Sequence, residues 1–572
     1  MLPLIHLFKA AISVSCIALS IAFAGPRIKP LRTQTTTKPF RVRKANASSQ
    51  PNTFGFSRRH NGYSSWNLNR FTLAAENEQK DAGASSWKTS LSQDPDPITA
   101  LKSLLSDIYS SSSNPIVKGV NNVKPAVLLV FVGKYHSNSF PEIVNELSRY
   151  LESNDMSDTR TLSMIGGGIV GGGIEVDDAV NRPAISMLAG TVDASSIELF
   201  GFNELREPKL PSEDSSVWSE LTSTSSSGNR SPSYLLFSDP WGPLTQTVDQ
   251  LTTDDDRKPV IAGGITCPQY TEPTLALDST LFPQGSILGL KLSHTLGLQA
   301  VVAQGCRAIG PYYTITSCER NALLELDGEP ALMQLMKLQK ELAEGDGRDT
   351  IGTDSVVLVG TSSYPQRTPT PASGKTTRNP PSDFLIRQIM GFQPNKNAIL
   401  VGDQLTEGDC FRFHLRDAQS AVDDWELMLS RVQQERMFQN TGDSSEETNC
   451  GPAGRPVAAI QISCVARGTG LFGTENVDLG YGKQLLGPSD NTSNEAPIAG
   501  LFANGGLGPV GIAGLSSSSS SSNSISQNSS TFMHGFTAVM ALICDYTKDI
   551  KPQLDDDNSI TAPFVEDDSA WQ

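Results

Sequence analysis

Short, continuous apolar runs recur along residues 123–551, and several of them end in glycine or proline. Such runs are typical of buried strands. The clearest examples in the first half are residues 126–133, 161–175, 184–190, 234–240, 260–266 and 285–292. Residues 140–153, in contrast, place their apolar side chains at helical spacing, with Pro141 near the start. Strands that alternate with helices predict an α/β fold of mixed sheets with flanking helices.

The same pattern continues through the second half of the chain. Strands are predicted at residues 356–360, 384–392, 458–464, 497–511 and 534–543, and helices from Pro330 onward and at 418–436. Residues 410–416, CFRFHLR, alternate apolar and polar side chains with a period of two. This alternation predicts a strand with one buried face and one solvated face, the latter carrying Arg412, His414 and Arg416.

Two stretches of the chain share a local pattern. In QGCRAIG (304–310) and in SCVARGTG (463–470), an apolar strand leads into a cysteine that is followed closely by arginine and glycine. The similarity suggests two related α/β domains behind a disordered presequence.

The ends of the chain differ from this pattern. Residues 1–24 hold one basic residue and then a short apolar run that ends in small residues, which predicts a signal peptide. Residues 25–75 are basic, rich in Ser, Thr and Asn and free of acid, as in a transit peptide. Residues 76–122 are interpreted as a polar linker that holds one helix at 98–109. Residues 552–572 form an acidic tail.

The junction SIAFAGP (20–26) resembles the bipartite plastid presequence of algae with secondary plastids, in which a phenylalanine follows the signal cleavage point. Phe23, after Ala22, fits that position. The resemblance implies delivery to the stroma of a complex plastid. The alternative is ordinary secretion, or residence in an endomembrane lumen, with residues 25–75 as a disordered basic pro-segment.

Charge is distributed unevenly. Residues 1–75 contain 11 Lys and Arg and no acid, which leaves 34 basic against 61 acidic residues in the remainder, a net charge of −27. Such an acidic body repels phosphate backbones, so we expect no nucleic-acid partner. No apolar run after the signal peptide approaches about 20 residues, so we expect no membrane span in the mature protein.

Cysteines, histidines and glycines give little support for a cofactor. Seven cysteines remain beyond the signal peptide, an odd number without regular spacing, which does not predict a disulfide framework. The histidines lie far apart and outside metal-ligand patterns, so no metal site is predicted. The glycine triplets within 165–173 lack the spacing of phosphate loops. We therefore expect no cofactor.

The two Cys-Arg-Gly stretches are the candidate ligand site. Glycine lets a backbone approach a ligand, and arginine offers a planar fork for a carboxylate. Both stretches follow strands, where α/β sheets tend to bind ligands. The candidate binding residues are Gly305, Cys306, Arg307, Gly310, Cys464, Arg467 and Gly468. Arg307 and Arg467 are the candidate carboxylate clamps.

Two other interpretations of these stretches stay open. Cys306 is a candidate nucleophile if Arg307 lowers the pKa of its thiol, although no histidine lies in a recognised Cys-enzyme context. Alternatively, Cys306 and Cys464 fill space in the core, and each arginine braces a turn or pairs with a buried acid.

Several motifs, in order, are similar to a known pair of domains. They are LLVFVG, IGGGIVGGG, IAGGIT, QGCRAIGP with ELDGEPAL, LTEGDCFRFHLRD, SCVARGTGLFG and GLFANGGLGPVG followed by HGFT. This series resembles the paired FIST domains, with the N-terminal domain at 123–322 and the C-terminal domain at 323–551. The chain departs from the family at Gly506, where a glutamate is common.

The resemblance implies a sensory module that binds small ligands such as amino acids in signalling proteins. No F-box, kinase or methyl-accepting output segment is recognised in the chain, so we expect it to signal through a protein partner. The alternatives are an interaction scaffold or substrate-recruiting adaptor, and a thiol-dependent hydrolase or transferase that uses Cys306.

Overall fold

The computed structural model of the chain describes residues 85–109, 124–178, 180–203, 221–222, 231–253, 259–268, 273–293, 295–344, 355–362, 384–441, 454–487, 496–515 and 530–546. These residues belong to one compact unit. The predicted signal peptide, the transit-like segment and the acidic tail lie outside them.

Three sheets are built on one strand order that occurs three times along the chain. The first unit contains β1 (Ser86–Ser92), α2 (Pro97–Tyr109), β2 (Val127–Gly133), η3 (Lys134–Ser139), α3 (Phe140–Ser153), β3 (Arg160–Gly166), β4 (Gly168–Gly171), β5 (Ile174–Val176) and β6 (Ile185–Thr191). The second contains η4 (Ala194–Ser196), β7 (Ile197–Asn203), β8 (Ser233–Ser238), α5 (Leu244–Thr253), β9 (Ile261–Ile265), β10 (Leu275–Leu277), β11 (Thr280–Phe282) and β12 (Ser286–Leu292).

The third unit is interrupted by a long insertion. It begins with β13 (Leu296–Ala303) and resumes with β21 (Arg455–Cys464), α8 (Thr469–Phe472), α9 (Val477–Leu486), β22 (Ile498–Ala503), β23 (Gly505–Pro509), β24 (Ile512–Ala513), β25 (Thr531–His534) and β26 (Ala538–Asp545). The strand orders β1-β6-β2-β3, β7-β12-β8-β9 and β13-β26-β21-β22 correspond, and in each only the last pair is parallel.

Each unit completes the sheet of another. After β3, strand β4 pairs with β22 and β5 extends it; after β9, strand β10 pairs with β3 and β11 extends it; after β22, strand β23 pairs with β9 and β25 extends it. Three equivalent backbone hydrogen bonds join the units where the chain passes from one sheet to the next. Gly167 N donates to Phe502 O (2.8 Å), Cys267 N to Ile165 O (3.2 Å) and Asn504 N to Ile265 O (2.9 Å). The repetition is therefore threefold and cyclic.

The three sheets share one hydrophobic core. Successive side chains of a strand point to opposite faces, so every second residue of the central strands reaches that core. Residues of this kind on β2, β8 and β21 include Leu129, Phe131, Leu235, Phe237, Ile460 and Ile462. The rings of Phe131 and Phe237 meet edge to face at 6.4 Å.

Glycine is required at one equivalent position in two of the parallel strand pairs. A Cβ at Gly263 would overlap the carbonyl oxygen of Leu236, and one at Gly500 would overlap that of Gln461. The two glycines occupy equivalent positions in IAGGI and IAGLFA. These sequence runs therefore reflect the packing of the sheets.

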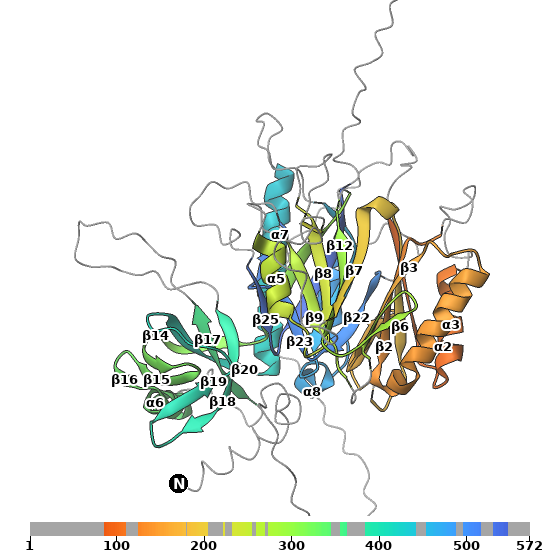
Figure 1. The fold of residues 1–572 in the computed structure, drawn as a ribbon. Coiled ribbons are helices and arrows are strands. Elements are labelled where there is room, and N and C mark those ends of the chain that lie inside the picture. Colours follow the sequence, from red (N-terminus) through yellow and green to blue (C-terminus); the bar gives the residue numbers. More distant parts are fainter. Residues whose placement is uncertain are drawn as a thin grey trace, which may run out of the picture. The chain divides into compact units, whose positions relative to one another are not determined.

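Helices cover the outer faces of the sheets. Figure 1 shows α2 and α3 on the sheet that holds β2, β3 and β6, where their apolar side chains form a second core with Leu128, Val130 and Val132. Helix α5 packs on the sheet of β8 and β9. Helices α7 (Ala418–Thr441) and α9 pack on that of β21 and β26.

The insertion in the third unit forms a small barrel. It contains β14 (Arg307–Glu319), β15 (Ala322–Leu326), β16 (Glu329–Pro330), α6 (Ala331–Glu344), β17 (Val356–Ser362), β18 (Leu385–Gln393), β19 (Ala398–Val401) and β20 (Cys410–Arg416). The ring order β14-β20-β17-β18-β19-β15 closes because β15 also pairs with β14. Helix α6 contributes Leu335 and Leu338 to the barrel core.

The predicted α/β class is confirmed. The chain repeats one strand order three times, whereas the sequence suggested two related domains. The two Cys-Arg-Gly stretches are not equivalent, because one enters the barrel after β13 and the other follows β21. The domain boundary expected between residues 322 and 323 falls within β15 of the barrel. The helix expected at 98–109 is present. The residues before it, expected as linker, form β1 and pair with β6.

Candidate functional site

The candidate residues meet where the barrel joins the third unit. Gly305 and Cys306 lie between β13 and β14, and Arg416 ends β20. Gly305 N donates to Asp424 Oδ2 of α7 at 2.8 Å. A side chain at Gly305 would collide with Arg467 Nη1, so the two Cys-Arg-Gly stretches are in contact. Both stretches are candidates for one ligand site, and the fold brings them together.

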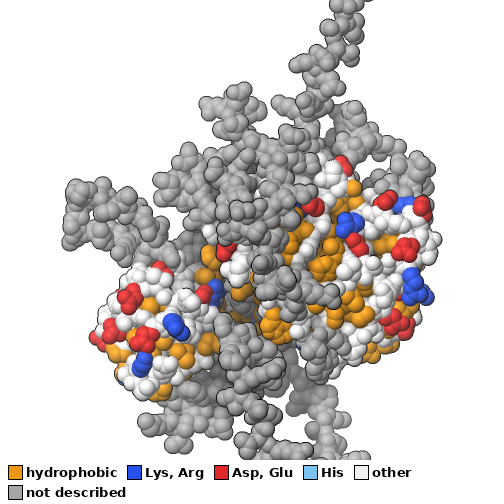
Figure 2. Space-filling model, in the orientation of Figure 1, with side chains coloured by type: hydrophobic (Ala, Val, Ile, Leu, Met, Phe, Trp, Pro, Cys, Tyr) orange, Lys and Arg blue, Asp and Glu red, His pale blue; other side chains and the backbone are white. Residues whose placement is uncertain are grey.

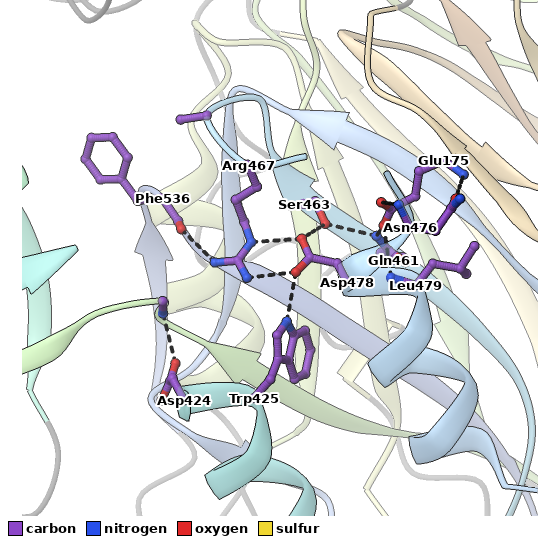
Figure 3. Close-up of polar contacts among 12 residues, drawn as sticks. Glu175, Asp424, Trp425, Gln461, Ser463, Arg467, Asn476, Asp478, Leu479 and Phe536 are labelled. Atoms are coloured by element: carbon purple, nitrogen blue, oxygen red, sulfur yellow. Dashed lines mark hydrogen bonds and ion pairs between the residues drawn. The ribbon is translucent and has the colours of Figure 1, made fainter. Parts of the chain in front are cut away.

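Arg467 is already occupied by an acid of the same chain. Its side chain is 0% exposed, with Nε 2.8 Å from Asp478 Oδ2 and Nη2 2.7 Å from Asp478 Oδ1 (Figure 3). Nη1 donates to the Phe536 carbonyl at 3.2 Å. A planar guanidinium satisfied in this way has no free fork for a ligand. The prediction that Arg467 clamps a carboxylate is therefore corrected: the carboxylate it holds is internal.

Asp478 is satisfied from three directions. Besides Arg467, it accepts hydrogen bonds from Trp425 Nε1 (2.8 Å) and Ser463 Oγ (2.9 Å). Burial acts to raise the pKa of Asp478, but the charge and hydrogen bonds of Arg467, aided by those two donors, outweigh it and hold the pKa below its usual range. The pair is consequently ionised and fixed in place.

The polar network extends from Ser463 to the hairpin β4–β5 of the first unit. Gln461 Nε2 donates to Ser463 Oγ (3.1 Å) and to Glu175 Oε1 (2.6 Å). Glu175 also accepts the backbone N–H groups of Asn476 (2.8 Å) and Leu479 (2.9 Å) at the start of α9 (Figure 3). Burial, and then the nearby Asp478 carboxylate, raise the pKa of Glu175 to about 7.

Arg416 is a second buried arginine at this site. It is 7% exposed, and Nη2 donates to the Ala466 carbonyl at 2.6 Å. Its Nε has no hydrogen-bond partner, and no ion pair joins Arg416 to any acid among the residues that the structure describes. Burial, followed by the neighbouring Arg467 charge, lowers the pKa of Arg416 to about 10. A buried guanidinium in this state lacks a counter-charge in direct contact with it.

The strand of Arg416 corrects a second prediction. The polar face of CFRFHLR was expected to be solvated, but His414 and Arg416 are buried. Arg412 is the most exposed of the three and is itself half-buried. His414 packs on Gly360 and on the Phe384 ring. Burial lowers the pKa of His414 to about 4, so the ring is neutral.

Phe536 lies over the Arg416 guanidinium. Its ring centroid is 5.1 Å from Arg416 Cζ, and its φ is +65°, a left-handed backbone that bulky residues rarely adopt. Neighbouring Gly535 is exposed. Phe536 belongs to the HGFT motif of the FIST resemblance, for which the sequence predicts no role.

Neither cysteine has the surroundings of a nucleophile. Burial, and then the Asp424 carboxylate, raise the pKa of the Cys306 thiol above its usual range, which opposes the expected activation by an arginine. Cys306 packs with Phe536 on the apolar patch of Leu358, Phe384, Ile386 and Cys410. Cys464 is buried at the end of β21. This corrects the hypothesis that a neighbouring cation activates Cys306.

The remaining candidate residues, Gly310, Gly468 and Arg307, lie against other parts of the same chain. Gly310, with φ +66°, faces Leu338 of α6 in the barrel, away from the network. Gly468, with φ +65°, lies against the Asp177 carboxylate, which accepts from Thr469 N at 2.6 Å. Arg307 is half-buried at the start of β14, paired with Leu415.

Gly506, the departure from the FIST pattern, pairs with His534 in the sheet. A Cβ there would lie 2.8 Å from Val539 Cγ2 and 3.2 Å from Thr537 Oγ1. A larger side chain at this position would need its neighbours to move.

Sequence reasoning missed the residues that define the site, namely Asp424, Arg416, Asp478 and Phe536. The signals were present in part, since Arg416 ends the alternating strand and Phe536 lies in HGFT. Periodicity cannot show, however, that a polar strand face is covered by another part of the chain.

Two negative findings concern the described part of the chain. No group of three or more His, Cys, Asp or Glu side chains there is arranged to hold a metal ion. None of its helices combines the length and the apolar character needed to cross a membrane.

Comparison with known proteins gives two kinds of match. The FIST N domain model matches residues 126–329, and the FIST C domain model matches residues 359–509. An uncharacterized protein of Mycobacterium tuberculosis is 28% identical over 318 residues, which cover 54% of this chain and 68% of the relative. An uncharacterized protein of Mycobacterium bovis is 28% identical over 314 residues, 54% and 67% of the two chains. The two domain models in tandem span most of the described structure, and the chain therefore belongs to the FIST family.

Proposed function

We propose that this chain is a sensor that binds a small carboxylate, such as an amino acid, through Arg416 and signals to a protein partner. The observation that carries the proposal is the buried guanidinium of Arg416, with an unpartnered Nε and no ion pair to an acid in the described part of the chain. A carboxylate would supply both the missing hydrogen-bond acceptor and the missing counter-charge.

Family membership supports the class of function, because FIST domains are associated with the sensing of small ligands in signalling. The partner is expected to contact exposed apolar side chains, such as Met333 and Met336 on α6. Figure 2 shows hydrophobic side chains among charged ones on one face of the molecule.

The proposal can be tested by alkylating Cys306 with two reagents of different charge. In both reactions the sulfur attacks the CH2 carbon and iodide leaves, but only iodoacetate carries a carboxylate that Arg416 can attract. The ratio of the iodoacetate rate to the iodoacetamide rate cancels the thiolate fraction. Arg416→Gln should lower this ratio at least about fivefold, by removing a counter-charge interaction worth roughly 1 kcal/mol or more.

Arg412→Gln is the matched control, because Arg412 lies on the same strand but stacks on Tyr312. It should leave the ratio unchanged. A ratio that does not respond to Arg416→Gln would contradict the proposal. A thermal-shift screen of acetate, succinate and amino acids then searches for the ligand, since a ligand at 100 times its Kd stabilises by about 2.7 kcal/mol.

For localisation, we propose delivery to the stroma of a complex plastid, supported by Phe23 after Ala22 and by the acid-free segment that follows. Residues 1–75 fused to a fluorescent protein should direct it to the plastid of an alga with secondary plastids. Fluorescence confined to the endomembrane lumen or the medium would overturn this assignment.

A further inference from the structure

The Arg416 site is closed in the described conformation. The Nε atom is inaccessible to solvent and has no partner, and the whole residue is 7% exposed. A carboxylate can reach this atom only if a neighbouring group moves. Its neighbours include the loop after β21, whose Ala466 carbonyl accepts from Arg416, and the Gly535–Phe536 segment, which joins β25 to β26.

The Gly535–Phe536 segment has the features of a movable element. Phe536 holds a left-handed backbone at φ +65°, an outlier for a bulky side chain. Gly535 is exposed, and a Cβ built there would meet no atom within 4 Å. The segment therefore combines strain with free space beside it.

Few contacts hold the segment in place. The Phe536 carbonyl accepts from Arg467 Nη1 at 3.2 Å, and the Thr537 carbonyl accepts from Cys464 N at 2.9 Å. The half-buried Phe536 ring lies on Arg416 and packs with Cys306 against the apolar patch of the barrel. The ring thus lies over Arg416 and shares this apolar patch with the half-buried Cys306.

We propose that Phe536 is the gate of the Arg416 site, an inference that rests on the proposed function. In the open state Phe536 relaxes to an ordinary backbone conformation, and its ring leaves Arg416 and Cys306. Opening also breaks the hydrogen bond from Arg467 Nη1 to the Phe536 carbonyl. Because Arg467 is fixed to Asp478, the gate is coupled to the network that reaches Glu175 and the β4–β5 hairpin.

The test measures how fast neutral iodoacetamide alkylates Cys306 in the full chain, followed by peptide mass spectrometry. Phe536→Ala removes the cover and should accelerate alkylation about tenfold. Phe472→Ala is the matched control, because its half-buried ring lies 5.4 Å from Cζ of the other buried arginine, Arg467. That variant should change the rate less than twofold.

The gate is refuted if Phe536→Ala leaves the rate unchanged, or if Phe472→Ala accelerates alkylation equally. If Phe536→Ala does not fold, Phe536→Asn serves instead, since asparagine tolerates a left-handed backbone and lacks the ring. The outcome is separate from that of the proposed function, because this reagent is neutral. If Phe536→Ala accelerates alkylation but Arg416→Gln leaves the iodoacetate-to-iodoacetamide ratio unchanged, the gate is supported and the proposal of a carboxylate ligand is refuted.

Discussion

At Gly305 the chain turns from β13 into the barrel with φ +70°, and its N–H is fixed by Asp424. The space that a side chain would take is filled by Arg467 Nη1. Both the backbone conformation and the close contact therefore require glycine at this position.

Gly305→Ala should destabilise the fold more than an alanine that meets conformational strain alone. Gly328→Ala is the control, since Gly328 has φ +83° and open space around it. We expect a loss of about 1 kcal/mol for Gly328→Ala and at least about 1 kcal/mol more for Gly305→Ala. Urea denaturation measures both, and equal losses would show that the contact with Arg467 has no energetic weight.

A larger loss of stability is expected when the Arg467–Asp478 ion pair is broken. Asp478→Asn leaves a buried guanidinium without its counter-charge and should lower the free energy of unfolding by about 3–5 kcal/mol. The exposed pair Lys396–Glu319 is the comparison, because Glu319→Gln should cost no more than about 1 kcal/mol. A small effect of Asp478→Asn in denaturant titration would mean that the pair is dispensable.

Among the elements, helix α9 begins against a carboxylate from a distant hairpin. Glu175 of β5 accepts two N–H groups at this helix start, where a negative charge is favoured. Its pKa of about 7 nevertheless lies above the ordinary value of 4.5, because burial and Asp478 oppose ionisation. Between these values the folded chain binds more protons than the unfolded chain.

Glu175 therefore makes the fold less stable as pH rises from about 4.5 to about 7, and this loss is complete above that range. In Glu175→Gln the free energy of unfolding should fall by roughly 1–3 kcal/mol less between pH 4.5 and pH 7 than in the wild type. The new amide faces the N–H of Asn476 or Leu479, so the variant is compared with the wild type by the slope of its stability profile and not by its absolute stability. Urea titrations at several pH values give the test; an unchanged slope in the variant would contradict it.

Strand β20 shows how far the pattern of an element can be read. Its alternation predicted the strand and the buried face of Phe411, Phe413 and Leu415. The opposite face, with His414 and Arg416, also proved to be buried. Polar side chains that line a protein interior have the same spacing as those that face water, so the sequence cannot separate the two.

At the scale of the whole molecule, the barrel is an insertion between adjacent points of the third unit. Gly305 and Asp424, which flank it, are joined by a hydrogen bond. Replacing residues 307–416 with a short glycine-rich linker should leave the three sheets folded, with one cooperative thermal transition. Circular dichroism and calorimetry check this, and a chain without a transition would show that the barrel is needed for folding.

The α/β class followed from strands and helices in alternation, whereas the threefold repetition did not. The equivalent core positions hold Leu129, Leu235 and Ile460, which share apolar character and little else. The partners exchanged between units lie far apart in the chain, and local patterns carry no information about such pairings. The Cys-Arg-Gly similarity suggested two related domains, but the two stretches are not equivalent in the fold and instead meet where the barrel joins the third unit.

Because the units exchange hairpins, some strands must wait during synthesis for a partner that lies far along the chain. Strand β4 ends at Gly171, and its partner β22 starts at Ile498, so the ribosome must add the intervening residues before the two can pair. At roughly 5–20 residues per second this wait lasts on the order of tens of seconds. During that time the nascent chain exposes an apolar, unpaired edge, and we expect chaperones to engage it before the ring of units can close.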